Sequence, residues 1–118
     1  MKIDQQYRDQ FLLHYMVAAI TLMDEEHPEL SLEDIHPEAK EKMREDCENF
    51  INANAADLQG MDPQQAGCDF WLTRNGHGAG YWDRDLEEVG ERLSAACGHG
   101  TPFPQVDLYV GDDGKAYL

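Results

Sequence analysis

Apolar side chains recur at three- and four-residue spacing through most of the first hundred residues, and this spacing predicts helices. The first predicted helix covers residues 4–25. Pro28 prevents its continuation, because proline has no backbone N–H and clashes with the preceding turn. Pro37 suits the first turn of a second helix, and Gly60 is placed to end that helix.

Two shorter helices are predicted in the second half of the chain. Asp62 can cap the third helix, Pro63 fits its first turn, and the glycines of residues 76–80 end it. The fourth helix is expected to begin at Asp85 and to stop at the Gly-His-Gly segment 98–100.

The pattern changes to strict alternation near the C-terminus, with Val106, Leu108 and Val110 on one side and Asp107 and Tyr109 on the other. This alternation predicts a strand, "GDDG" a turn and "KAYL" a short return strand. A two-stranded hairpin is marginal alone, so it should pack on the helices. The predicted fold is mainly α (α+β), with about four helices followed by a short C-terminal β-hairpin.

Length favours a single domain over residues 1–118, with an acidic helical half (1–60) and a second half (61–118) that ends in the hairpin. The chain has 24 acidic residues against 9 Lys and Arg, a formal charge of −15. Such a field repels nucleic-acid phosphates and anionic membranes and attracts basic surfaces. It also keeps a small protein soluble, which is the simpler interpretation.

The second predicted helix carries a concentrated set of acids, which are Glu38, Glu41, Glu45, Asp46 and Glu48. Like charges at i,i+3 and i,i+4 spacing cost helix stability. One interpretation is a solvated face. The sharper interpretation is an anionic surface that occupies the nucleic-acid groove of a basic protein, and these acids are then its binding residues.

Targeting signals and disulfide scaffolding are not expected. The start "MKIDQQYRDQ" lacks the pattern of a signal peptide, and the longest apolar run, "MVAAI", is too short to span a bilayer. Cys47, Cys68 and Cys97 are odd in number and form no C-x-x-C pair. These features predict a protein of a reducing cytoplasm.

Residues 69–84, "DFWLTRNGHGAGYWDR", form an aromatic–glycine motif. His77 could act there as a general base oriented by a carboxylate such as Asp83, with Arg74 or Arg84 binding an anion. The alternative is a structural joint or a binding surface, and it is favoured because no nucleophile–base pattern is visible. The candidate binding residues of the motif are Trp71, Asn75, His77, Tyr81 and Trp82, with the aromatics acting as anchors only if exposed.

No cofactor or metal is expected. "GHGAG" lacks the spacing of a dinucleotide fingerprint and the lysine of a phosphate-binding loop. The ligand-type residues Cys68, His77, Cys97 and His99 match no zinc spacing.

The motif and the closing "VDLYVGDDGKAYL" together resemble a group of small uncharacterised proteins of phages and prophages that carry "DFWLTRNGHGAGFWDR". The resemblance covers about residues 64–118, with Tyr81 in place of phenylalanine. It implies phage origin and a place in the host cytoplasm, and it assigns no activity. Small acidic phage proteins are similar in kind to inhibitors of host defence, such as anti-CRISPR proteins.

The leading hypothesis is a non-enzymatic phage accessory protein that binds and inhibits a host defence complex. Its acidic surface would engage the basic nucleic-acid-binding surface of that complex. It predicts no direct contact with nucleic acid or membrane, and leaves the oligomeric state open. Two alternatives remain. One is a small enzyme or ligand-binding protein centred on His77, Arg74, Asn75 and Asp83, and the other is a self-associating phage structural protein.

Overall fold

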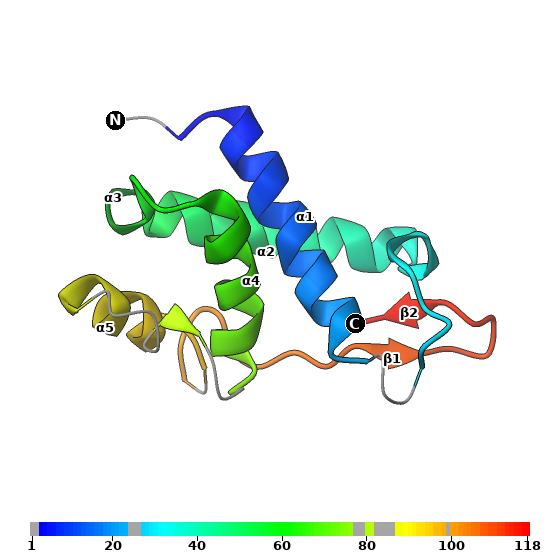
Figure 1. Cartoon of the computed structure of the whole chain (residues 1–118). Coiled ribbons are helices and arrows are strands. Elements are labelled where there is room, and N and C mark those ends of the chain that lie inside the picture. The colour runs from blue at the N-terminus through cyan, green and yellow to red at the C-terminus, as the bar shows by residue number, and fades with distance from the viewer. Residues whose placement is uncertain (1–2, 24–26, 77–79, 82–86, 99) are drawn as a thin grey trace.

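The computed structural model describes residues 3–23, 27–76, 80–81, 87–98 and 100–118 (Figure 1). The described part is mainly helical and ends in a two-stranded antiparallel hairpin, which confirms the predicted fold class. Its elements are α1 (Gln5–Thr21), the 3-10 turn η1 (Leu32–Asp34), α2 (Pro37–Ala53), α3 (Ala55–Leu58), α4 (Pro63–Arg74), α5 (Glu88–Ala95), β1 (Tyr109–Val110) and β2 (Ala116–Tyr117).

Side-chain caps fix where the long helices begin. The Asp4 carboxylate accepts a hydrogen bond from the Tyr7 amide at 2.8 Å. Asp62 accepts one from the Gln64 amide at 3.0 Å, with Pro63 in the first turn as the sequence predicts. Each cap satisfies an amide that has no partner within its helix.

The boundaries differ from the prediction in three places. The second predicted helix divides at Asn54, whose side-chain amide donates to the Phe50 carbonyl at 3.0 Å and competes with the helical backbone. Of the predicted strand 105–110, only Tyr109 and Val110 pair with β2. The expected start at Asp85 lies outside the described residues, and α5 is described from Glu88.

Helix α1 packs chiefly against α4, and Gly67 of α4 lies against the backbone of Phe11. A Cβ atom at this position would overlap the backbone carbonyl of Phe11. Glycine is therefore needed in the middle of α4, although it costs helix stability there.

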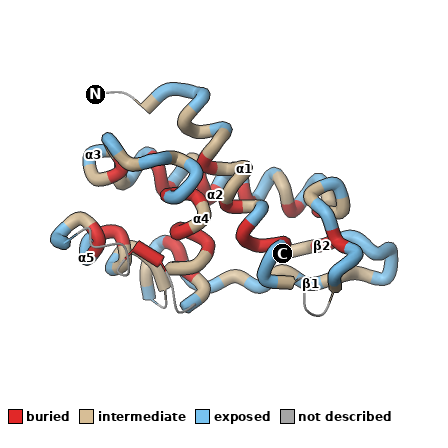
Figure 2. The backbone as a smooth tube through the Cα atoms, in the orientation of Figure 1, coloured by how far each residue is buried: buried red, intermediate tan, exposed pale blue. Residues whose placement is uncertain are grey.

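Aromatic rings fill the space between α1, α2 and α4, where Figure 2 shows the buried positions. Phe50 of α2 stacks on Phe70 of α4 with ring centroids 4.1 Å apart. Phe103 meets both rings edge-on, and Tyr15 of α1 lies 5.1 Å from Phe70. The core therefore joins residues from both halves of the chain.

The hairpin packs on the connector before α2. Tyr109 pairs with Tyr117 across the two strands, and the fully buried Ala116 forms a bridge with Ile35. The His36 amide donates to the Ala116 carbonyl at 2.8 Å. These contacts place the hairpin and the connector side by side at one end of the molecule (Figure 1).

Candidate functional site

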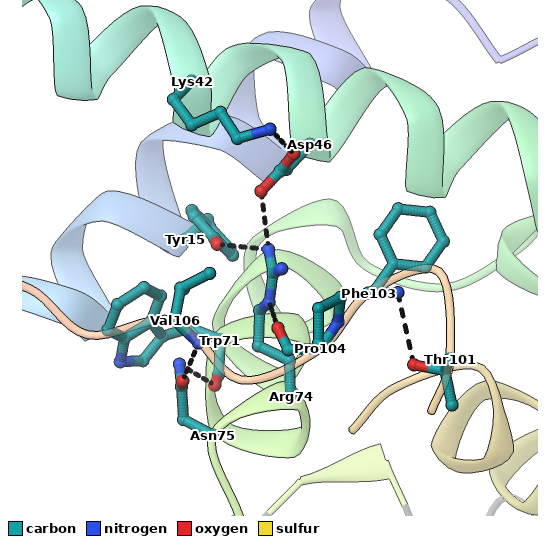
Figure 3. Close-up of polar contacts among 10 residues, drawn as sticks. All are labelled: Tyr15, Lys42, Asp46, Trp71, Arg74, Asn75, Thr101, Phe103, Pro104 and Val106. Atoms are coloured by element: carbon teal, nitrogen blue, oxygen red, sulfur yellow. Dashed lines mark hydrogen bonds and ion pairs between the residues drawn. The ribbon is translucent and has the colours of Figure 1, made fainter. Parts of the chain in front are cut away.

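Arg74, at the end of α4, joins three segments of the chain (Figure 3). One terminal nitrogen, Nη1, donates to the Tyr15 hydroxyl at 3.0 Å and to the Asp46 carboxylate at 2.9 Å. Nε donates to the Pro104 carbonyl at 2.9 Å. The guanidinium carbon also lies 5.2 Å from the centre of the Phe70 ring. The side chain is 3% exposed and is committed to internal partners.

The surroundings of Arg74 keep it charged. Burial favours the neutral form, but the Tyr15 hydroxyl and the Asp46 carboxylate stabilise the cation and raise the pKa of Arg74 on balance. Burial raises the pKa of the Tyr15 phenol well above its ordinary range. Asp46 receives a second cation, Lys42, at 3.2 Å. Arg74 therefore acts as a structural cation. Its contacts are with internal partners and do not support the predicted role of binding an external anion.

Asn75 extends the same joint by one residue. Its amide nitrogen donates to the Trp71 carbonyl at 3.0 Å, and its oxygen accepts from the Val106 amide at 2.9 Å (Figure 3). The hydrogen bond from Val106 to Asn75 and the bond from Arg74 to Pro104 together hold segment 104–106 against the end of α4. Both ends of the Asn75 amide are thus engaged inside the protein.

Trp71 and Tyr81 are core residues, 4% and 0% exposed. The Trp71 ring packs edge-on against Tyr15 at 5.3 Å, and the Tyr81 hydroxyl donates to the Ala66 carbonyl at 2.6 Å. The prediction made these rings anchors for a partner only if they were exposed, and both are buried. Trp71 thus packs on α1, and Tyr81 bonds to the backbone of α4.

The remaining candidates of the motif, His77, Trp82 and Asp83, lie outside the described residues. A catalytic site would need Arg74 and Asn75 to face a substrate together with His77. In the described part of the chain, the polar groups of Arg74 and Asn75 bond to other segments of the protein.

The acids of α2 divide into two groups. Three are neutralised by neighbouring cations: Glu41 pairs with Arg44, Glu48 with Arg8, and Asp46, 8% exposed, with Arg74 and Lys42. Glu38 and Glu45 are exposed and form no ion pair with another described residue. The helix predicted to carry the anionic surface therefore contributes less free charge than its composition indicates.

A more strongly acidic surface lies at the hairpin end of the molecule. No Lys or Arg occurs between Arg8 and Lys40, a stretch that includes the whole connector before α2. Contacts of Ile35 and His36 with Ala116 bring this connector against the hairpin. We define the acidic end by its described acids, which are Glu29, Glu33, Asp34, Glu38, Asp112 and Asp113.

Three rings form a row across the acidic end. His36 stacks on Tyr117 at 4.6 Å, and Tyr117 stacks on Tyr109 at 5.8 Å. Tyr109 is 54% exposed, the most exposed of the large apolar side chains described. The alternation that opposes Tyr109 to Val110 is a sequence signal for this exposure. The stacking of Tyr117 on Tyr109 and on His36 was not predicted from the sequence. It depends on the register of the two strands, which the turn sets.

Cys47 and Cys97 form no disulfide. Cys47 is buried, which raises the pKa of its thiol well above the ordinary value, and burial raises that of Cys97 to about 12. Among the residues that the structure describes, no three potential metal ligands gather. His77 and His99, the histidines considered as ligands, lie outside that part.

Across the described chain, no helix is both long enough and apolar enough to cross a bilayer. Comparison with protein-family models, with curated proteins and with solved structures gives no match.

Proposed function

We propose that this protein is a non-enzymatic binding protein whose acidic end engages a basic surface of another protein. The observation that carries the proposal is the distribution of charge: the connector has acids and no Lys or Arg, and the hairpin adds Asp112 and Asp113 beside it. Lys40 and Lys115 are the nearest basic residues in sequence and leave a clear acidic excess. Opposite charge accelerates encounter and helps to select the partner.

The polar groups at the end of α4 favour binding over catalysis. Arg74 and Asn75 were the described members of the catalytic alternative, and both are used to hold segment 104–106. A group that acts on substrate must be free to reach it. The self-association alternative is disfavoured by the net charge of −15, because two copies of an acidic chain repel each other.

The resemblance of residues 64–118 to phage and prophage proteins suggests a more specific function. We propose that the partner is a nucleic-acid-handling defence complex of the host, such as a CRISPR complex, in the host cytoplasm. The basic groove of such a complex binds phosphates, so an anionic protein surface can compete for it. The acidic end would then act as an inhibitor without contacting nucleic acid itself.

A plaque assay tests this proposal. The chain is expressed in matched hosts with and without a CRISPR system, which are then challenged with a targeted phage. We expect higher plating efficiency only in the host that carries the defence. The triple variant Glu29→Gln/Glu33→Gln/Glu38→Gln should lose this effect, because it removes charge from the acidic end.

The matched control is Asp9→Asn/Glu45→Gln/Glu91→Gln, which changes the net charge equally at exposed positions elsewhere. It should retain activity. Purified complex should also release the protein as salt rises. Wild-type chain without effect on plating would reject the defence role, and equal loss in both triple variants would reject the acidic end as the interface.

A further inference from the structure

We propose that the hollow between Tyr109, Tyr117 and the hairpin turn receives an arginine side chain from the protein partner. This inference rests on the proposed function, since it specifies how a basic partner is recognised. The hollow is lined by Tyr109, Gly111, Asp112, Asp113 and Tyr117.

The turn is shaped to sit against Tyr117. A Cβ at residue 111 would lie 2.7 Å from Cε2 of the Tyr117 ring, so only glycine allows this approach. The Tyr117 hydroxyl donates to the Asp113 carboxylate at 2.6 Å, and the Lys115 amide donates to the same carboxylate at 3.0 Å. Asp113 thereby fixes the ring and the turn relative to each other.

The other two groups of the hollow are available to a ligand. Asp112 is exposed and forms no ion pair with another described residue. Tyr109 stacks on Tyr117 at an interplanar angle of 22° and still exposes 54% of its surface. An aromatic ring that is half exposed and a carboxylate that line the same hollow are suited to a planar cation.

Arginine fits these groups better than other ligands. Its guanidinium stacks on an aromatic face and can pair with a carboxylate through two parallel hydrogen bonds. Lysine could make the ion pair but lacks the planar stack. A second copy of this chain is a poor source, because it brings 9 basic residues with 24 acids. Glu38, which lies near Tyr117, adds to the field that attracts a cation.

The test uses three synthetic peptides, Gly-Arg-Gly-Arg-Gly and its lysine and citrulline analogues, all with blocked termini. Binding to the full chain is followed by NMR of the tyrosine ring signals. We expect the arginine peptide to shift the Tyr109 and Tyr117 rings. The lysine peptide should bind several-fold more weakly. The citrulline peptide, which is nearly isosteric and uncharged, should not bind.

Four variants distinguish the interactions. Tyr109→Leu should remove binding, whereas Tyr109→Phe should keep it, because stacking needs the ring and not the hydroxyl. Asp112→Asn should weaken binding, and Asp107→Asn, an exposed acid of the same segment, should not. Melting temperatures check that each variant is folded. Ring shifts that persist in Tyr109→Leu, or that appear equally with citrulline, would overturn the inference.

The two proposals fail separately. If the Glu29/Glu33/Glu38 variant abolishes the plaque effect while Tyr109→Leu leaves both peptide binding and plaque effect unchanged, the proposed function stands and the arginine hollow is rejected. If the peptide binds as expected but neither the triple variant nor Tyr109→Leu alters plating, the hollow stands and the proposed defence interface is rejected.

Discussion

Arg74 and Asp46 form a buried ion pair of 2.9 Å that ties the end of α4 to the middle of α2. Arg74→Met should destabilise the protein by about 3–5 kcal/mol, because it leaves a buried carboxylate without its main partner. Arg74→Lys should recover only part of the loss, since one ammonium cannot serve Tyr15, Asp46 and Pro104 together. Urea denaturation measures both changes.

Arg44→Met is the control for the Arg74 experiment. Arg44 pairs with Glu41 on the exposed side of α2, where solvent screens the interaction, so little stability should be lost.

Asp46→Asn combined with Arg74→Met should cost less than the sum of the single changes. Additive costs would mean that the two side chains do not stabilise each other.

Gly67→Ala should be strongly destabilising even though alanine favours helix formation. The added methyl group would overlap the Phe11 carbonyl, and relief requires α1 and α4 to separate. We expect a loss of about 3 kcal/mol, at the upper end of the range for overpacked positions. Thermal unfolding measures the change. Gln64→Ala, an exposed change in the same helix, should have an effect of less than about 0.5 kcal/mol.

The thiols of Cys47 and Cys97 should react slowly with an aromatic disulfide reagent at pH 8. Burial raises the pKa of both, to about 12 for Cys97, and the thiolate is the reactive form. Rates measured in Cys47→Ala and Cys97→Ala variants assign each thiol. Rapid reaction of either one in the folded chain would contradict its raised pKa, and denaturant should restore ordinary reactivity.

Alkaline titration should show that the fold keeps tyrosines protonated. The pKa of Tyr117 is raised to about 12, first by its hydrogen bond to Asp113, and that of Tyr7 to about 12, first by burial. A raised pKa in the folded state stabilises the protein below the ordinary value of about 10. This contribution is therefore lost as the pH rises from about 10 to 12. Tyrosinate absorbance of Tyr117→Phe against wild type measures it, and a difference spectrum that titrates near pH 10 would contradict the prediction.

Much of the helical framework follows from local sequence signals. Asp62 and Pro63 mark the start of α4 because capping and proline geometry depend on near neighbours. The alternation of residues 106–110 also predicts that Tyr109 lies on the outside, because successive side chains of a strand point to opposite faces. The division at Asn54 was not predicted, since it depends on one side chain competing for the Phe50 carbonyl.

The roles of the candidate residues were harder to predict, because they depend on contacts between distant segments. Sequence cannot show that Arg74 meets Asp46 and Tyr15, and without those contacts an arginine near glycines is compatible with anion binding. The same holds for the acids of α2, whose partners Arg8 and Arg74 come from other helices. The row of His36, Tyr117 and Tyr109 likewise joins a connector to a hairpin far along the chain.

The close approach of Gly67 to Phe11 bears on the order of folding. Helix α1 is synthesised before α4, yet it buries Phe11 and Tyr15 mainly against α4. Contacts between residues distant in sequence form slowly, because a long loop must close before they give any stability. The face of α1 that packs on α4 is therefore covered only after α4 has been synthesised, and we expect the acidic connector to limit association between nascent chains during that interval.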